Sequence, residues 1–494
     1  MSLKDDLRQY HIPIALFFIS ILAFALRICK LDAESLWLDE VISIMDIPSA
    51  IRTFPGGHNV HPPFYFIALH LWSRVVGQSE FSLRFLSALF GPLTAAMTYK
   101  LAGILFDRRT ALLSGLFLAL CPYHVYYSQE ARMYTLLPFL GLVGAYCFFQ
   151  ALERHDRKLY WIGFVLCSAL GLYTHYYTLF LLLFENFFFL SLTIIRRQYR
   201  CSFKAWLLAQ LAIFCLYLPW LPVLLIQSTR GKQDWIGALS FGHLYGALIA
   251  YFVTPNPERK LHLFVGSFGV IFLMTLGAIG ARITEDRQRL SFPLGRSRLY
   301  VLAYLAVPFL VPYAASLLIG PIFVARYLTI CVPAACILLA YGLNLVKPKF
   351  LALLLGLLLS WTMITYLDSI YNTTNRDDWR SVARYLGTRI QRDDLICFNA
   401  EQARLSFYHY YDKEGLNEIT LSEIGEDSSS IADKTTHFQR IWLIISLGAE
   451  SIHDQHTLTT FRQRAPHSKL LVDEEFTGIK VLLFTLNRFT EDYQ

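Results

Sequence analysis

Long apolar stretches alternate with short polar ones from residue 11 to about residue 367 of this chain. Each apolar stretch has roughly 18 residues or more, enough to cross a hydrocarbon layer of about 30 Å as a helix. We predict about eleven membrane-spanning helices, near residues 11–30, 83–105, 110–127, 135–152, 159–176, 177–195, 205–226, 261–281, 299–319, 327–346 and 350–367. The pattern predicts a polytopic α-helical membrane protein.

After residue 367 the chain becomes polar, and the spacing of its apolar residues changes. Amphipathic stretches alternate with short apolar ones, an order that is typical of a small α/β domain. We predict helices at 377–391 and 401–411 and strands at 394–400, 440–447, 469–475 and 479–486. The predicted division is therefore a membrane domain over residues 1–367 and an α/β domain over residues 368–494.

Composition supports the membrane assignment. The chain is 55% apolar and 16% charged, with a mean hydropathy of +0.42, whereas a soluble protein carries about 25% charged residues. The net charge of +7 does not indicate nucleic-acid binding, because the positive charge concentrates in the predicted cytoplasmic loops of a membrane protein.

Lys and Arg concentrate in alternate polar segments. If the N-terminus is cytoplasmic, the inner segments hold 18 Lys and Arg in 46 residues, and the outer segments hold ten in about 100 residues. Cytoplasmic loops carry such an excess of positive charge. We predict an integral protein of the plasma (inner) membrane with a cytoplasmic N-terminus and its α/β domain outside, in the periplasmic or extracellular space.

Two short polar stretches interrupt the apolar pattern on the predicted outer side. "LWLDEV" places Asp39 and Glu40 in the first outer loop, about residues 31–82, and "SQEARMY" places Glu130 and Arg132 in the second. A carboxylate in a partly apolar cleft can act as a general base on a hydroxyl. The planar guanidinium of an arginine suits phosphate.

Further polar residues fall on the same side. "GGHNVHPPFYF" contains His58 and His61, and "GPIFVARYL" contains Arg326 and Tyr327. Together with the two carboxylate stretches, they suit the displacement of a phosphate leaving group by an alcohol at the membrane surface. Each also has a structural interpretation as a solvated loop charge, an ion pair or a snorkelling side chain. His175, among tyrosines in "YTHYY", fits an aromatic belt at the interface.

The order of these stretches resembles the bacterial branch of the GT-C glycosyltransferases, which is similar to protein O-mannosyltransferases and the lipid A aminoarabinose transferase. The motifs that carry the resemblance are "WLDE", "HPPFYF", "SLRFLSALFG", "YYSQEARMY", "FVARYL" and "DDWRSVARYL". It implies a GT-C-like fold and an enzyme that takes a hexosyl or pentosyl group from a polyprenyl-phosphate donor. The sugar passes, with inversion, to an acceptor hydroxyl at the outer face of the membrane.

The resemblance also implies roles for residues of this chain. Asp39 would be the general base, with Glu40 and Glu130 as further catalytic carboxylates. The donor phosphate would be bound by Arg132, Arg326 and Tyr327, and the substrates would be positioned by His58, His61, Tyr127 and Gln129.

Cofactor and partners follow from the same resemblance. Some GT-C enzymes need a divalent cation, Mg or Mn, and others need none; Asp39, Glu130 and His61 are the candidate ligands here. The expected partners are the lipid-linked sugar, membrane lipids and an acceptor that is a lipid, a glycan or a protein, with no nucleic acid. A transporter or flippase of lipid-linked glycans and a polysaccharide polymerase or ligase of another membrane fold are the alternatives.

Overall fold

The computed structural model describes most of the chain, in two compact units. The first comprises residues 1–31 and 46–372, and the second comprises residues 32–45 and 373–494. The described residues are 3–52, 61–154, 158–195, 202–229, 239–253, 260–280, 282–283, 290–291, 295–374, 376–411, 415–421, 438–447, 458–459, 461–462 and 468–486. The second unit thus takes a short segment from the part of the chain that we predicted to belong to the membrane domain.

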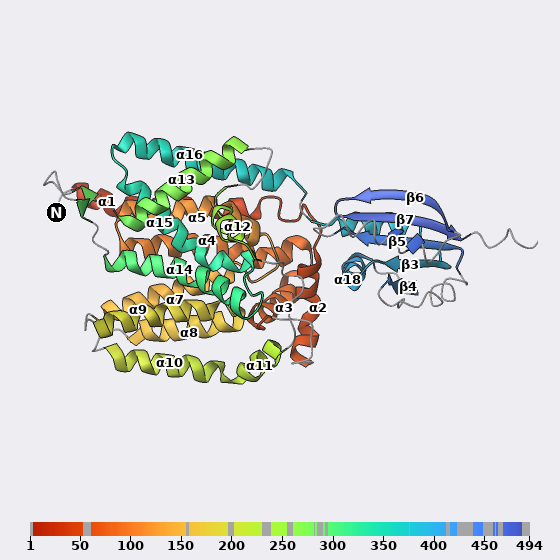
Figure 1. Ribbon diagram of the computed structural model, residues 1–494, viewed down its shortest axis with the longest axis horizontal. Helices are drawn as coiled ribbons and strands as arrows, with labels where there is room; N and C mark the ends of the chain where they lie inside the picture. Colours follow the sequence, from red (N-terminus) through yellow and green to blue (C-terminus); the bar gives the residue numbers. More distant parts are fainter. Residues whose placement is uncertain are drawn as a thin grey trace, which may run out of the picture. The chain divides into compact units, whose positions relative to one another are not determined.

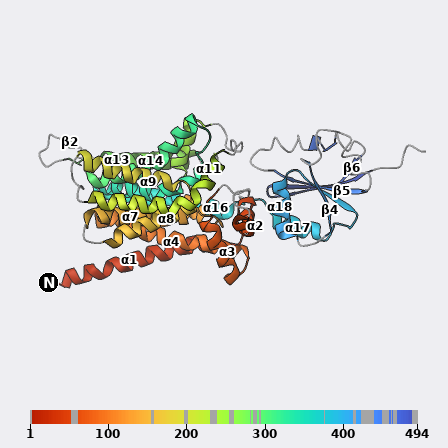
Figure 2. The same cartoon turned by 90° about the horizontal axis from the view of Figure 1, so that it is seen from below.

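The first unit is a bundle of helices (Figure 1). Its α-helices are α1 (Leu3–Ile28), α3 (Phe64–Val76), α4 (Glu80–Leu105), α5 (Arg108–Leu120), α6 (Pro122–Ser128), α7 (Leu136–Glu153), α8 (Lys158–Thr174), α9 (Thr178–Ile195), α10 (Phe203–Tyr217), α11 (Leu221–Thr229), α12 (Phe241–Ile249), α13 (Lys260–Ile279), α14 (Arg296–Leu318), α15 (Val332–Leu345) and α16 (Lys349–Asn372). α2 (Leu38–Arg52) belongs partly to each unit. Figure 2 shows α1 running along one side of the bundle, where it packs against α4 and α5.

Shorter elements also occur in the described part of this unit. Two 3₁₀ helices, η2 (Leu218–Trp220) and η4 (Ala325–Cys331), precede α11 and α15, and a two-stranded antiparallel sheet joins β1 (Arg282–Ile283) to β2 (Leu290–Ser291).

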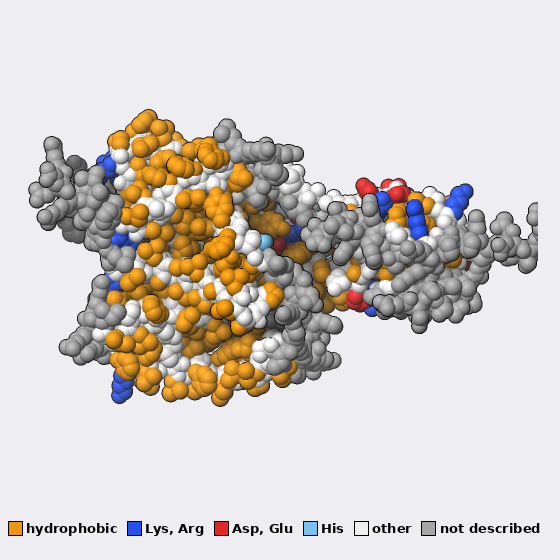
Figure 3. Space-filling model, in the orientation of Figure 1, with side chains coloured by type: hydrophobic (Ala, Val, Ile, Leu, Met, Phe, Trp, Pro, Cys, Tyr) orange, Lys and Arg blue, Asp and Glu red, His pale blue; other side chains and the backbone are white. Residues whose placement is uncertain are grey.

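The apolar surface of the bundle fits a membrane protein. Six of its described helical stretches have at least 18 residues and are apolar enough to cross a membrane, and shorter apolar helices lie beside them. Hydrophobic side chains cover most of the face of the bundle seen in Figure 3. A helix overlaps each of the eleven ranges predicted from the sequence, and the prediction of a polytopic α-helical membrane protein is confirmed.

One predicted span is broken. The range 110–127 contains two helices, because α5 ends at Leu120 and α6 begins at Pro122. A proline has no backbone N–H and is accommodated at the first position of a helix but not in its interior. The break gives the chain a short separate helix just before the "SQEARMY" stretch.

The second unit is built on a five-stranded mixed sheet. Its strands are β3 (Asp394–Phe398), β4 (Asn417–Thr420), β5 (Arg440–Ser446), β6 (Ser468–Phe476) and β7 (Ile479–Leu486), in the order β4-β3-β5-β7-β6. β3 is parallel to β4 and β5, whereas β7 is antiparallel to β5 and β6. The helices α17 (Trp379–Gly387) and α18 (Glu401–Tyr410) supply Trp379 and Phe407 to the core on one face. The predicted α/β character of this region is confirmed.

The segment 32–45 is tied to the rest of the second unit by hydrogen bonds. The Ser35 hydroxyl donates to the Asp377 carbonyl over 2.6 Å, and the Leu36 N–H donates to the Tyr410 hydroxyl over 2.6 Å. Arg380 donates to the Asp32 carbonyl over 3.1 Å. The segment that carries Asp39 and Glu40 therefore folds with the C-terminal part of the chain.

Candidate functional site

The "SQEARMY" stretch forms a buried turn between α6 and α7. Glu130 and Arg132 are only 1% and 4% exposed. The Arg132 N–H donates to the Glu130 carbonyl over 2.7 Å, and the Ser87 hydroxyl from α4 donates to the Arg132 carbonyl over 2.8 Å. Charged side chains are seldom buried unless they are paired, so this turn is a strong candidate for a functional role.

The Arg132 guanidinium lies among aromatic rings. Its central carbon is 5.6 Å from the ring centre of Phe66 on α3 and 5.9 Å from that of Tyr134. Rings at such distances attract a cation by their quadrupole. Tyr134 also contacts Tyr127, with ring centres 5.3 Å apart, so the predicted residue Tyr127 adjoins the Arg132 environment.

Three rings from distant parts of the chain meet beside this turn. The ring centre of Tyr327 is 4.4 Å from that of His175 and 5.6 Å from that of His61, and the two histidine rings are 5.2 Å apart. All three side chains are buried. We call His61, Arg132, His175, Arg326 and Tyr327 the ring cluster.

Both histidines of the ring cluster are uncharged near neutral pH. Burial, together with the positive charges of Arg132 and Arg326, lowers the pKa of His175 to about 3. Burial and the same two arginines hold the pKa of His61 well below its ordinary value. The arginines thus supply positive charge to the ring cluster, and the histidines supply neutral polar atoms.

The segment that bears Arg326 is held by tyrosine hydroxyls from other parts of the bundle. Tyr177 donates to the Ile322 carbonyl and Tyr251 to the Leu328 carbonyl, each over 2.9 Å, and Tyr123 of α6 donates to the Ala325 carbonyl. These bonds position η4, which begins one residue before Arg326.

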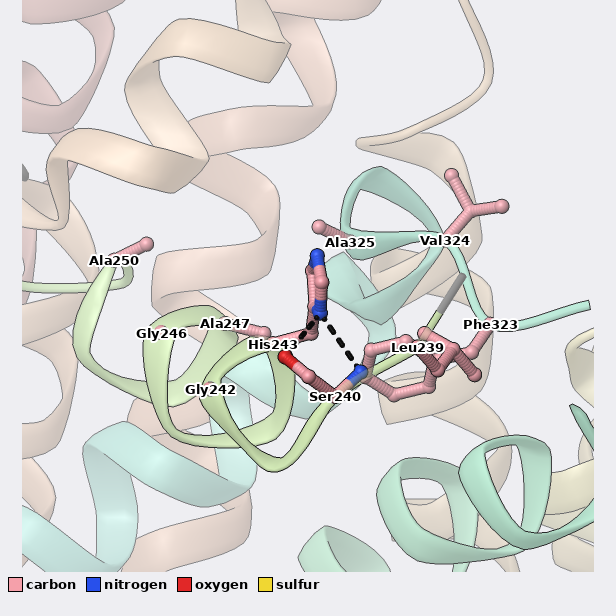
Figure 4. Close-up of a pocket in the computed structure, with 10 residues that line it drawn as sticks. All are labelled: Leu239, Ser240, Gly242, His243, Gly246, Ala247, Ala250, Phe323, Val324 and Ala325. Atoms are coloured by element: carbon pink, nitrogen blue, oxygen red, sulfur yellow. Dashed lines mark hydrogen bonds between the residues drawn. The ribbon is translucent and has the colours of Figure 1, made fainter. Parts of the chain in front are cut away.

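A cavity of about 590 Å³ lies between α12 and the residues just before Arg326 (Figure 4). Its lining is mostly small or apolar: Leu239, Gly242, Gly246, Ala247, Ala250, Phe323, Val324 and Ala325. The polar lining residues are Ser240 and His243, and His243 Nδ1 accepts a hydrogen bond from the Ser240 N–H over 3.0 Å. The cavity is thus an apolar space that adjoins the arginine-bearing segment.

Gln129 binds the end of α1. Its amide nitrogen donates to the carbonyl oxygens of Arg27, over 3.2 Å, and Cys29, over 2.7 Å. These bonds tie the turn between α6 and α7 to the first helix. These contacts indicate that Gln129 holds the turn, and its predicted role in positioning substrate stays a prediction.

Glu40 belongs to the segment 32–45 of the second unit. It is fully buried, its Oε2 is 3.9 Å from Nη1 of Arg376, and it accepts a hydrogen bond from the Trp37 N–H over 3.3 Å. Arg376 also lies 3.7 Å from Glu34. Asp39 occupies the first turn of α2 and is half-buried. The two adjacent carboxylates therefore have different surroundings, and Glu40 has a structural partner.

Two sequence expectations remain without a structural description. His58 lies outside the described residues. Among the residues that the structure does describe, no three His, Cys, Asp or Glu side chains are grouped so as to hold a metal ion. The predicted role of Asp39, His61 and Glu130 as metal ligands stays a prediction.

The structure also adds residues that sequence analysis missed. Arg27, at the end of the first apolar run, and His175, which we assigned to an aromatic belt, are both buried within the bundle. Arg376, the partner of Glu40, follows the last apolar run. In the sequence, each of these residues is a charged or imidazole side chain at the border of an apolar run. Side chains that anchor a helix at the membrane surface occupy the same position, so the sequence does not distinguish the two roles.

Similarity to known protein sequences covers part of the chain. The pattern of the family described as dolichyl-phosphate-mannose-protein mannosyltransferase matches residues 60–222. An uncharacterized protein of Aquifex aeolicus is 30% identical over 108 residues, and this match spans 22% of the present chain and 22% of that relative.

Similarity to solved structures extends over nearly the whole chain. ArnT from Cupriavidus metallidurans in the apo state is similar with a TM-score of 0.62 at 12% identity, covering 94% of this chain and 97% of that one. The same protein bound to undecaprenyl phosphate gives 0.59 at 13% identity, with the same coverage. The archaeal oligosaccharyltransferase AglB from Archaeoglobus fulgidus, in complex with an inhibitory peptide and a dolichol-phosphate, gives 0.59 at 12% identity, covering 99% and 75%.

At this level of identity the similarity establishes the fold. The chain is an integral membrane protein with the GT-C fold, as the sequence resemblance predicts.

Proposed function

We propose that this protein is a glycosyltransferase that moves a sugar from a polyprenyl-phosphate donor to an acceptor hydroxyl. The observation that carries the proposal is the ring cluster, in which Arg132 and Arg326 act electrostatically on two neutral histidines next to a largely apolar cavity. Guanidinium groups bind phosphate through their planar array of donors. An apolar cavity beside them accommodates part of a lipid chain.

Lipid phosphates in the similar structures support this donor class. ArnT was solved with undecaprenyl phosphate and AglB with a dolichol-phosphate. In the present chain, we assign the donor phosphate to Arg132, Arg326 and Tyr327 and part of the polyprenyl chain to the cavity between α12 and Val324. His61 and Tyr127 would position the substrates.

The proposed reaction is a single inverting displacement. The acceptor oxygen attacks the anomeric carbon of the donor sugar, and the bond between that carbon and the phosphate oxygen breaks. The bonding electrons leave with the polyprenyl phosphate, whose negative charge Arg132 and Arg326 stabilise. Asp39 accepts the proton of the acceptor hydroxyl, and Glu130 orients the reacting groups.

A divalent cation, Mg or Mn, would be held by Asp39, His61 and Glu130, and it would supply further positive charge for the leaving phosphate. The steps above concern the chain's own residues.

We further propose that the reaction takes place on the outer side of the inner membrane. Lys and Arg on the face of the bundle seen in Figure 3 lie mainly at the end where the N-terminus lies, and positive charge is favoured on the cytoplasmic side. The acceptor would then be a lipid, a glycan or a protein outside the cytoplasm.

Purified protein in lipid nanodiscs tests the proposal. The assay measures transfer or hydrolysis of a panel of undecaprenyl-phosphate-linked hexoses and pentoses. We expect Asp39→Asn and Glu130→Gln to lower the rate by about 100-fold or more, since a general base alone contributes about 10²–10⁴. Asp473→Asn, which removes an exposed carboxylate from the second unit, is the matched control and should retain full activity.

Two outcomes contradict the proposal. Folded Asp39→Asn and Glu130→Gln proteins with wild-type rates would show that these carboxylates are not catalytic. Movement of lipid-linked sugars across sealed vesicles, without hydrolysis or transfer of any donor in the panel, would favour the transporter alternative.

A further inference from the structure

His175 is held in a fixed orientation between α8 and α9. Its side chain is 2% exposed. Its backbone N–H donates to the Gly171 carbonyl over 2.8 Å, and its carbonyl accepts from the Thr178 N–H over 3.1 Å. Its ring nitrogen Nδ1 accepts a hydrogen bond from the Tyr177 N–H over 3.1 Å. The ring therefore cannot turn without losing a bond.

This bond determines which ring nitrogen carries hydrogen. A neutral imidazole has one donor and one acceptor nitrogen, and here Nδ1 must accept because the backbone N–H can only donate. The pKa of about 3 keeps the ring neutral at physiological pH. The hydrogen consequently resides on Nε2.

The Nε2–H group is buried without a hydrogen-bond partner among the residues that the structure describes. A buried donor that lacks a partner costs free energy, and most buried polar groups have one. An orphan donor of this kind, fixed in place beside Tyr327, is an exception that a ligand would explain.

The surroundings of His175 define the chemistry of that ligand. Arg132 and Arg326 are the charged groups that act on its ring, and both are positive. Their positive charge favours an anion over a neutral hydroxyl as the acceptor. The neighbouring rings of His61 and Tyr327, with ring centres at 5.2 and 4.4 Å, shield the position from water.

We propose that His175 is a phosphate-binding residue, whose Nε2–H donates a hydrogen bond to an oxygen of the lipid phosphate held by Arg132 and Arg326. The inference rests on the proposed function and adds to it a neutral donor that complements the two cations. A donor bonded in this way favours a phosphate over an uncharged lipid alcohol of the same length.

Binding measurements on the full-length protein in nanodiscs test this role. The probes are undecaprenyl phosphate and undecaprenol, which differ only by the phosphate. His175→Phe and His175→Asn should weaken binding of undecaprenyl phosphate about 10- to 100-fold, the usual effect of losing one hydrogen bond to a charged group, and leave undecaprenol unaffected. His175→Gln should restore most of the affinity, because its amide nitrogen can occupy the position of Nε2.

Tyr173→Phe is the matched control. It lies two residues away and loses a single exposed hydrogen bond, 3.0 Å long, to the Leu216 carbonyl. We expect it to bind both probes as the wild type does.

The outcomes separate this inference from the proposed function. If the variants bind undecaprenyl phosphate as the wild type does, while Arg132→Gln and Arg326→Gln lose affinity, His175 is not a phosphate ligand and the proposed donor class stands. If wild-type protein does not prefer undecaprenyl phosphate to undecaprenol, both proposals are wrong.

A measurement on wild-type protein covers the case in which the variants fail to fold. In protein labelled with ¹⁵N at histidine, one neutral imidazole protonated at Nε2 should shift when undecaprenyl phosphate is added and should not shift with undecaprenol. A spectrum that does not respond to the phosphate would overturn the assignment.

Discussion

Arg27 donates a hydrogen bond from its guanidinium to Nδ1 of His124, over 3.0 Å, in the interior of the bundle. The same guanidinium donates to the carbonyl oxygens of Leu118 and Ala119, at the end of α5, over 3.1 Å each. Arg27 thus joins the end of α1 to the break between α5 and α6. Since α6 leads into the turn of Glu130 and Arg132, this contact helps to position that turn.

Gly91→Ala should disturb this contact. A Cβ added at Gly91 of α4 would lie 2.0 Å from Cδ of Arg27 and 2.1 Å from Nε, so the arginine would have to leave its hydrogen bonds. Overpacking of a filled interior costs about 1–3 kcal/mol, more than the gain of about 1 kcal/mol from replacing glycine by alanine in a helix. We expect a lower midpoint of thermal unfolding, measured in nanodiscs.

Gly269→Ala is the control for this prediction. Gly269 lies in the apolar helix α13, and nothing lies within 4 Å of an added Cβ there. An unchanged or raised midpoint is expected. A Gly91→Ala protein as stable as Gly269→Ala would show that Arg27 adapts without loss.

Gly342→Ala should be more damaging than Gly91→Ala. An added Cβ would lie 1.9 Å from the Leu273 carbonyl oxygen of α13. Because that atom belongs to the backbone of a neighbouring helix, it cannot rotate away as an arginine side chain can. We expect the yield of folded protein, measured by size-exclusion chromatography, to fall below that of Gly91→Ala. Equal yields would indicate that α13 and α15 separate readily.

Glu40→Gln should destabilise the second unit. It removes the negative charge of Glu40 from beside the buried Arg376, and breaking a buried pair costs up to about 3–5 kcal/mol. Arg376 retains Glu34 at 3.7 Å, so we expect about 1–3 kcal/mol. Hydrogen exchange followed by mass spectrometry should show faster exchange in peptides covering residues 32–45 and α17.

Two variants calibrate this measurement. Glu401→Gln removes a more exposed pair with Arg404 and should cost no more than about 1 kcal/mol. Asp39→Asn should leave exchange in the second unit nearly unchanged while lowering activity. Equal exchange in Glu40→Gln and Glu401→Gln would contradict a structural role for Glu40.

The neutral histidines predict a pH dependence of stability. The folded-state pKa of His175, about 3, lies below its ordinary value of 6.5, so the unfolded chain binds the proton more readily. Its contribution is therefore complete above pH 6.5 and declines as the pH falls toward 3, by about 1.4 kcal/mol per pH unit. Thermal unfolding at pH 7, 6 and 5 should show a flatter profile for His175→Gln than for wild type. Identical profiles would argue against a neutral buried His175.

The helices of the bundle could be predicted because each depends on a local run of apolar residues. The break at Pro122 was missed because the run from 110 to 127 stays apolar across it. β4 was missed because it has only four residues, two of them polar and exposed. The pairing of Ser35 with Asp377 left no local signal, since the two residues are 342 positions apart.

The site was only partly predictable for a related reason. Glu130, Arg132 and Arg326 interrupt apolar runs and therefore attract attention. Arg27 and His175 lie at the ends of apolar runs, where a basic or imidazole side chain usually faces the lipid headgroups. Only the three-dimensional arrangement distinguishes a buried arginine from an anchoring one.

The separation of Ser35 from Asp377 also sets the order of assembly during synthesis. At about 5–20 residues per second, a ribosome needs about 17–68 s to make the 342 residues that separate the two hydrogen-bonding partners. During that time the segment bearing Asp39 lacks the hydrogen bond between Ser35 and Asp377, while the helices of the bundle are being made. The segment bearing the proposed general base can therefore be held by this hydrogen bond only after Asp377 has been made.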